Sequence, residues 1–325
     1  STLSQPAMMA IMLEALELQP GMSVLEIGTG SGYNAALLRQ IVGPTGRIVS
    51  VDVEADLVEQ AQQQLAAAGY GDVTVAVGDG ALGFPRLAPY DRIIATAAVD
   101  DIPAAWWSQL ATAGRLAMPL ILVANLQAFV TFDRRGEEMI STEISPTAFI
   151  RLRGAYQGGG FKRTALAPGQ GVFVRYGAPP PLGPEPLYEQ LTGASRPHPL
   201  PVRLTPWELQ TALVPWLMLQ EPGLVYLQAR EPAGPFVPDL LYEQDPQLKN
   251  TLLLPGADGS AALARREGVG DKLRKSFAPE DQQTFHLQIQ QFGASLDAAR
   301  RLAGLVNSWA QHGRPTVTQM HIRAQ

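Results

Sequence analysis

The stretch Val24–Leu38, VLEIGTGSGYNAALL, constrains the fold most, because an apolar strand pattern runs into three glycines and then into a helix. Gly28, Gly30 and Gly32 carry no Cβ, so a ligand can lie against the backbone of the loop. The N-terminus of the following helix offers N–H groups to an anion. The stretch therefore predicts a phosphate cradle, a site for another adenosine cofactor, or only a tight turn.

The same alternation of strands and helices continues through the first half of the chain. Strands are expected at 22–28, 46–52, 73–79, 90–98 and 114–122, and helices at 6–18, 33–42, 54–69 and 102–111. Residues 125–144 predict an antiparallel hairpin that turns at Arg135–Gly136. Alternating strands and helices imply a parallel sheet covered on both faces. We expect an α/β fold, a doubly wound Rossmann-like sheet with an antiparallel C-terminal hairpin.

The regular alternation of strand and helix patterns ends after Gly154. A linker and an irregular stretch are expected at Gly158–Gly160 and at 177–186, GAPPPLGPEP. Helices at 205–219 and 295–313, the first opening with a capping-box pattern, and strands at 223–230 and 284–290 predict further ordered structure. We expect two domains, 1–154 and 155–325, the second a smaller α+β domain that serves as an accessory, substrate-binding domain.

Composition narrows the classes of partner. The chain has 325 residues and a net charge of −5, and residues 1–154 hold nine arginines, no lysine and 16 acidic residues, a local charge of −7. Such a surface is poor at neutralising phosphates, so no nucleic-acid partner is expected. There is no cysteine, no signal peptide is visible and the most apolar segment is too broken to span a membrane, so we expect a cytoplasmic protein without a membrane partner.

Acidic residues surround the glycine loop. The spacing Gly28, Gly30, Gly32 does not match the dinucleotide fingerprint, and Glu26 just before the loop would repel a pyrophosphate. In S-adenosylmethionine the anion is instead a methionine carboxylate, and a Glu there can bind the methionine ammonium directly or through water. Asp52 ends the next strand, where it can accept hydrogen bonds from ribose hydroxyls.

Asp79 ends the third strand, where a carboxylate can approach an adenine edge. Taken alone, Asp52 or Asp79 is as readily an ordinary helix cap at a strand end. Three successive strand ends with suitable groups favour S-adenosylmethionine over this alternative.

The first domain has no histidine, cysteine or lysine to act as a base or nucleophile, because all four histidines lie after residue 154. Methyl transfer to a carboxylate needs none, since a carboxylate with a pKa of about 4 is already ionised at neutral pH. Alignment and partial desolvation of two opposite charges can then drive the reaction. Other acceptors can also react without a histidine.

Several linked motifs resemble one family. STLSQP, VLEIGTGSGY, VGDG, PYDRIIATAA, IPAAWWSQL and GRLAMPL follow, in order and spacing, the protein-L-isoaspartate O-methyltransferases over residues 1 to about 154. The resemblance implies a methyltransferase sheet that binds S-adenosylmethionine and esterifies a side-chain or isoaspartyl carboxylate in a peptide. Ser4 matches the family's hydroxyl beside the substrate carboxylate. On residue type alone, Ser4 before Pro6 is first an N-cap candidate.

The resemblance implies a set of site residues. The expected cofactor-binding residues are Glu26, Gly28, Thr29, Gly30, Ser31, Gly32, Asp52, Val53, Gly78, Asp79, Gly80 and Thr96. The expected substrate-binding residues are Ser4, Gln5, Ala97, Ala98, Asp100, Pro119 and Leu120, with Ser4 as the catalytic residue. No metal is expected, and we expect a monomer or a weak dimer.

The chain departs from the family pattern at AAVDDIP, at MPLIL and in its long C-terminal region. These departures resemble variants found beside ribosomal-peptide biosynthesis genes, which methylate an aspartyl side chain that then cyclises to aspartimide. We expect that activity, with repair of L-isoaspartyl residues as the alternative. A small-molecule or nucleic-acid methyltransferase and an inactive peptide-binding module are further alternatives. Trp106–Trp107 is a candidate peptide surface, unless one tryptophan packs its helix on the sheet.

Overall fold

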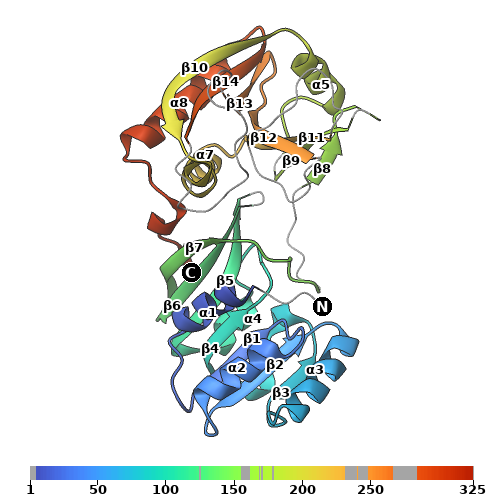
Figure 1. Ribbon diagram of the computed structural model, residues 1–325, viewed down its shortest axis with the longest axis vertical. Coiled ribbons are helices and arrows are strands. Elements are labelled where there is room, and N and C mark those ends of the chain that lie inside the picture. The colour runs from blue at the N-terminus through green and yellow to red at the C-terminus, as the bar shows by residue number, and fades with distance from the viewer. Residues whose placement is uncertain are drawn as a thin grey trace. The chain divides into compact units, whose positions relative to one another are not determined.

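The computed structural model describes residues 5–123, 126–154, 162–167, 169, 171–177, 179–230, 240, 248–265 and 284–324. These residues form two compact units (Figure 1). Unit 1 holds those within 1–122, 127–158 and 318–325, and unit 2 holds those within 123–126 and 159–317. The last described residues therefore belong with the first unit and not with the 155–325 segment expected from the sequence.

Unit 1 is built on an eight-stranded sheet in the order β15-β7-β6-β5-β4-β1-β2-β3. Its strands are β1 (Ser23–Ile27), β2 (Arg47–Asp52), β3 (Thr74–Val77), β4 (Tyr90–Ala95), β5 (Leu110–Val123), β6 (Leu126–Arg135), β7 (Glu138–Thr147) and β15 (Arg323–Ala324). The strands β3, β2, β1, β4 and β5 pair in parallel, and β6, β7 and β15 add antiparallel pairs. The expected doubly wound sheet with its antiparallel hairpin is confirmed.

Helices cover both faces of this sheet (Figure 1). They are α1 (Pro6–Ala15), α2 (Tyr33–Val42), α3 (Ala55–Ala67) and α4 (Ala104–Gln109), with short turns η1 (Gly80–Leu82) and η2 (Pro85–Leu87). One apolar core joins α1, α2 and α3 to side chains such as Val24 and Ile48. Side chains alternate between the two faces along a strand, so Ile27, three residues after Val24 on β1, points to the opposite face. Ile27 lies against Gly80, which places η1 on that face.

Unit 2 is an antiparallel sheet in the order β10-β14-β13-β12-β11-β9-β8. Its strands are β8 (Lys162–Ala165), β9 (Val172–Tyr176), β10 (Ser195–Leu204), β11 (Val225–Arg230), β12 (Leu248–Leu254), β13 (Gly259–Arg265) and β14 (Phe285–Gly293). Its helices are α5 (Pro184–Thr192), α6 (Pro206–Glu208), η3 (Leu209–Leu213), α7 (Val214–Gln220) and α8 (Asp297–Gln311), and the short turn η4 (Val317–Gln319) lies at the boundary of the two units in the chain. Among the described residues, no helix is long and apolar enough to cross a membrane.

Two parts of unit 2 differ from the sequence-based expectation. The stretch expected to be irregular ends inside α5, whose Leu187 and Leu191 are buried. The single helix expected at 205–219 is α6, a π-helical turn and α7 in succession. Pro215 has no N–H for the carbonyl one turn earlier, so the helix widens there. The expected capping box at Thr205 and Glu208 is confirmed.

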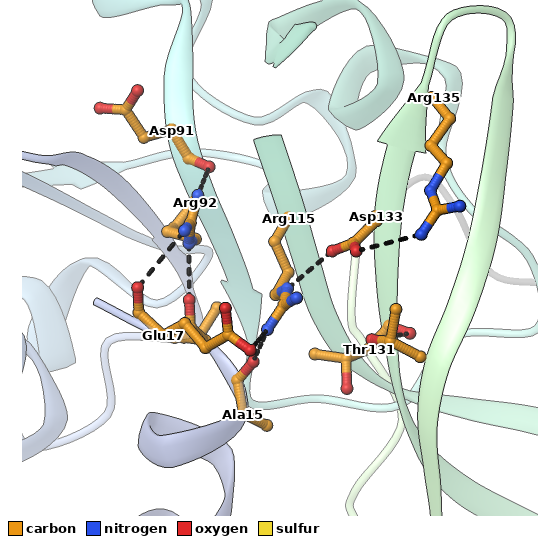
Figure 2. Close-up of polar contacts among 10 residues, drawn as sticks. Ala15, Glu17, Asp91, Arg92, Arg115, Thr131, Asp133 and Arg135 are labelled. Atoms are coloured by element: carbon orange, nitrogen blue, oxygen red, sulfur yellow. Dashed lines mark hydrogen bonds and ion pairs between the residues drawn. The ribbon is translucent and has the colours of Figure 1, made fainter. Parts of the chain in front are cut away.

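Two arginines on neighbouring strands hold the C-terminal end of α1 (Figure 2). Arg115 on β5 donates from Nη1 to the Ala15 carbonyl at 2.8 Å, and Arg92 on β4 donates from Nε to the next carbonyl at 2.5 Å. Burial lowers the pKa of the Arg92 guanidinium, and the charge of Arg115 lowers it further. Glu17 and Asp133 pair with Arg115 at 2.8 and 2.7 Å and offset this charge. The network fixes α1 to the sheet.

Replacing Arg115 with methionine is expected to lower the free energy of unfolding by about 2 kcal/mol, because the Ala15 carbonyl and two carboxylates lose a largely buried donor. The matched control is Arg135→Met, because Arg135 is mostly exposed and lies 4.0 Å from the same Asp133 carboxylate. Its loss is expected to stay under about 0.5 kcal/mol. Urea denaturation measures both, and equal losses would show that Arg115 does not hold α1.

Candidate active site

The glycine loop between β1 and α2 is held by close backbone contacts. Gly28 N donates to the Val51 carbonyl at 2.8 Å, and the Thr96 hydroxyl donates to the Gly28 carbonyl at 2.9 Å. Gly28 has a φ of +99°, and a Cβ there would collide with that hydroxyl. At Gly30 a Cβ would meet no atom within 4 Å. The loop therefore needs glycine for its path and opens onto free space at its tip.

The buried carboxylate of Glu26 connects the glycine loop to β2 and α2 through hydrogen bonds. Its carboxylate accepts hydrogen bonds from Asn34 Nδ2 at 2.7 Å and Ser50 Oγ at 2.5 Å, and Ser50 Oγ in turn lies 2.7 Å from Thr29 Oγ1. Glu26 has no exposed surface. Burial raises the pKa of Glu26 to about 7, the bonds from Ser50 and Asn34 oppose this rise, and the charge of Asp52 adds to it.

Both Glu26 oxygens are thus bonded to side chains of the protein. Contact of Glu26 with a methionine ammonium, directly or through water, stays a prediction. Through these hydrogen bonds Glu26 also positions the glycine loop.

The two aspartates at the strand ends meet the loop from the side. Asp52 accepts hydrogen bonds from Gly30 N at Oδ2 and from Glu54 N at Oδ1, both at 3.1 Å. Asp79 caps η1, since its Oδ1 accepts from Ala81 N at 2.9 Å. The helix-cap interpretation of Asp79 is therefore confirmed. The Asp79 carboxylate still lies at the end of β3, where the sequence predicts it. Asp52 links the loop tip directly to the end of β2.

The other cofactor candidates lie along the same edge of the sheet. Gly78 N donates to the Asp52 carbonyl at 2.9 Å, and Thr96 N donates to the Ile27 carbonyl at 2.9 Å. Gly80 packs directly over Ile27, where a Cβ would not fit. The structure therefore brings the carboxyl ends of β4, β1, β2 and β3 together, as the sequence predicts.

This edge has the donors, acceptors and apolar surface that an adenosine cofactor with an amino-acid tail needs. Ser31 Oγ is buried and has no hydrogen-bond partner within the described ranges. α2 begins after Gly32 without a side-chain cap, so its first N–H groups can receive a carboxylate. Val53, which directly follows Asp52, and Leu82, three residues after Asp79, are exposed apolar side chains that can cover a flat ring. The residues present fit S-adenosylmethionine.

Known proteins share this sequence and arrangement. A family model described as Protein-L-isoaspartate(D-aspartate) O-methyltransferase matches residues 1–157. Protein-L-isoaspartate O-methyltransferase of Ignicoccus hospitalis is 42% identical over 151 residues, which cover 46% of this chain and 72% of the relative. Protein-L-isoaspartate O-methyltransferase 1 of Archaeoglobus fulgidus is 49% identical over 155 residues, which cover 48% and 70%. The chain belongs to this family.

A solved structure named protein-L-isoaspartate O-methyltransferase aligns with 100% of this chain and 79% of its own, with a TM-score of 0.50 and 22% identity. At this identity the likeness concerns the fold, and it spans both units. The protein is thus an S-adenosylmethionine-dependent carboxyl O-methyltransferase. When bound, S-adenosylmethionine supplies a methyl group on a positively charged sulfur.

The residues expected to line the acceptor side begin where β4 ends. Ala98 N donates to the Ile150 carbonyl at 2.8 Å, and the Ala98 carbonyl accepts from Leu152 N at 2.8 Å. Val99 N donates to the Pro119 carbonyl at 3.1 Å. The expected acceptor residues Ala97, Ala98, Pro119 and Leu120 are all buried in this arrangement. The loop after β4 is thus clamped between β5 and residues 150–152.

The N-terminal motif is described from Gln5 onward, and Ser4 lies outside the described residues. Gln5 is exposed and occupies the N-cap position of α1 without a side-chain capping bond. The first turn of α1 lies beside the end of β7, where Thr147 Oγ1 lies 3.6 Å from Met8 Sδ. The catalytic role of Ser4 and the substrate contact of Gln5 stay predictions.

The two tryptophans of α4 have different environments. Trp106 is fully buried and donates from Nε1 to the Gly80 carbonyl at 2.8 Å. Trp107 is half-buried, with the Arg134 guanidinium 5.2 Å from its ring centre. Trp106 is therefore excluded from the candidate peptide surface, and the alternative that one tryptophan packs the helix is confirmed.

Residues 150–154, which we call the edge segment, contribute contacts that the sequence-based site missed. Arg151 Nη1 donates to both oxygens of Asp100, at 2.9 and 2.8 Å. Arg153 pairs with Glu54, beside Asp52. Gly154 lies so close to the Asp79 carboxylate that a Cβ would collide with it. The edge segment therefore runs from the expected acceptor loop to the strand-end carboxylates expected to bind the cofactor.

Simple signals in the sequence mark some of the missed residues. Ser50 interrupts an otherwise apolar strand, and a polar residue in such a run needs a buried partner. Arg151 and Arg153 stand on alternate positions of FIRLRG, which is typical of a strand with one charged face. Asn34 carries no such signal, because the second position of a helix accepts many polar residues.

The buried Glu26 makes the stability of the methyltransferase depend on pH. Because its pKa is raised from 4.5 to about 7 on folding, the folded state binds this proton more tightly. The resulting stabilisation is complete below the unfolded pKa and is lost as the pH rises through the folded pKa. Relative to Glu26→Gln, the wild type is expected to lose about 3 kcal/mol of unfolding free energy between about pH 4.5 and pH 8.

Urea denaturation of both proteins across this range measures the difference. Glutamine keeps the size of the side chain and can still accept from Asn34, so the variant retains the packing of the site. Curves of unfolding free energy against pH that run parallel for the two proteins would contradict the raised pKa.

Proposed function

We propose that this methyltransferase esterifies the free carboxylate of L-isoaspartyl residues in proteins and peptides, as a repair enzyme. The observation that carries the proposal is the identity of 42% and 49% to two relatives named for this activity, over the unit that holds the site. The described strand-end residues at this site support it, because they include the groups expected for the cofactor.

The residues of this chain contribute to the reaction by aligning the acceptor carboxylate with the methyl donor and by removing water from around both. The acceptor carboxylate is already ionised at neutral pH, so no base is required, and residues 1–154 contain no histidine, lysine or cysteine. S-adenosylmethionine, when bound, would supply the methyl group, which would pass to a carboxylate oxygen while the electron pair of the methyl–sulfur bond stays on sulfur. A negative and a positive charge are consumed together and no proton moves.

The buried loop after β4 supports this chemistry by excluding water from the acceptor side. Ala98 and Pro119 are buried apolar residues of this region, and loss of water would strengthen the attraction between carboxylate and sulfonium. Glu26 and Asp52 hold the glycine loop, so the donor side is ordered before the acceptor arrives.

The methyl ester then reacts without further help from the protein. The next backbone nitrogen attacks the ester carbonyl, methanol leaves and a five-membered imide forms. Hydrolysis of this imide returns part of the material as ordinary aspartyl residues, which is the repair outcome.

An aspartyl side chain in a modified ribosomal peptide is the second candidate acceptor, and it is the activity that the sequence alone favours. The altered loop around Asp100 supports it. The C-terminal region no longer adds to it, because a solved structure named for the isoaspartyl activity aligns with both units.

A pair of matched peptides separates the two acceptors. The full-length enzyme and S-adenosylmethionine are incubated with peptides that differ only in one isoaspartyl or aspartyl linkage, and mass spectrometry follows the gain of one methyl and the later loss of methanol. We expect methylation of the isoaspartyl peptide and none of its partner. Methylation of the aspartyl peptide alone would overturn the proposal.

Asp52 is expected to contribute to cofactor affinity. Asp52→Asn removes the charge that accepts hydrogen bonds at the ribose side, and the dissociation constant for S-adenosylmethionine is expected to rise about tenfold in calorimetric titration. Asp72→Asn is the matched control, because Asp72 is an exposed carboxylate that pairs with Arg39. Equal affinities of wild type and Asp52→Asn would remove Asp52 from the cofactor site.

A further inference from the structure

Arg151 has more hydrogen-bond donors than its pairing with Asp100 uses. A guanidinium carries five N–H groups, and both bonds to Asp100 come from Nη1. Within the described part of the chain, Nε and Nη2 have no hydrogen-bond partner. The side chain is 39% exposed, so a ligand in solution can reach these donors.

The Asp100–Arg151 pair is not required to hold the edge segment in place. The hydrogen bonds between Ala98 and the backbone of Ile150 and Leu152 already do so from both sides. An ion pair this exposed adds at most about 1 kcal/mol to stability. The pair therefore contributes its charge and its donors to the acceptor edge more than it contributes to the fold.

The free side of the Arg151 guanidinium, Nε with Nη2, is a planar fork. Such a fork matches the two oxygens of a carboxylate, which it binds bidentately. Asp100 occupies the other side, so the guanidinium is oriented before a ligand arrives. Asp100 also lies only four residues after Thr96, on the loop that leads from the cofactor edge to the acceptor side.

The carboxylate bound by this fork is not the one that reacts. An ion pair with Arg151 would stabilise the reacting anion more than the neutral ester that it becomes, and would therefore slow methyl transfer. A second carboxylate on the same peptide has no such conflict, because it keeps its charge throughout.

We propose that Arg151 binds a second carboxylate of the acceptor peptide, from an acidic residue beside the methylated one, and that Asp100 orients the guanidinium for this contact. The proposal rests on the peptide-acceptor function proposed above. It makes the enzyme selective for isoaspartyl sites in acidic surroundings.

Two isoaspartyl peptides that differ by Glu or Gln at the position next to the acceptor test this selectivity. The wild type is expected to show a KM about two- to fivefold lower for the Glu peptide, with the same kcat. Arg151→Gln is expected to abolish the difference by raising KM for the Glu peptide. Arg135→Gln, at an exposed arginine on β6, is the control and is expected to keep it.

Asp100→Asn separates recognition from a structural role of the pair. This variant breaks the ion pair but retains the Arg151 fork, so the preference for the Glu peptide is expected to persist or to increase. Loss of the preference in Asp100→Asn as well as in Arg151→Gln would show that the pair acts only through the fold.

The two proposals fail in different ways. If neither isoaspartyl peptide is methylated, the proposed function fails. If the wild type methylates both with the same KM, the proposed function stands and the assignment of Arg151 is overturned.

Discussion

A carboxylate with no exposed surface, Glu26, joins β1, β2 and α2 beneath the glycine loop, and the geometry of the cofactor edge depends on it. An unpaired buried charge would cost several kcal/mol, and two hydrogen bonds offset part of this cost. The raised pKa shows that burial still outweighs the bonds. The loop is thus ordered at the expense of stability at neutral pH, which is a common compromise at sites that must be rigid before a ligand binds.

The parts of the site that could be predicted from the sequence are those set by local pattern. Alternating strands and helices place Asp52 and Asp79 at neighbouring strand ends whatever the details of packing. The contacts of Glu26 could not be predicted in this way, because Ser50 comes from a different strand and Asn34 from a helix. These distant partners, which hydrogen-bond both of its oxygens, become visible only in the fold.

Two proline residues explain why the strand β10 of unit 2 was not predicted from the sequence. Pro197 and Pro199 stand in the strand β10, where each removes a backbone donor and argues against a strand. β10 is an edge strand of its sheet, and an edge has one side whose N–H groups need no partner. In contrast, the helix expected at 295–313 is present as α8, whose Leu302, Val306 and Trp309 are fully buried in one core.

The path of the chain makes unit 2 an insertion rather than an appendage. The chain leaves the first sheet after β7 and returns for β15, where Ser141 N donates to the Ile322 carbonyl at 3.0 Å and Ile322 N donates to Ser141 Oγ at 2.9 Å. Cutting the protein after Gly154 would strip this strand from β7 and leave a sheet edge open to aggregation. An isolated catalytic unit would have to be engineered by excision and rejoining, with the final residues retained.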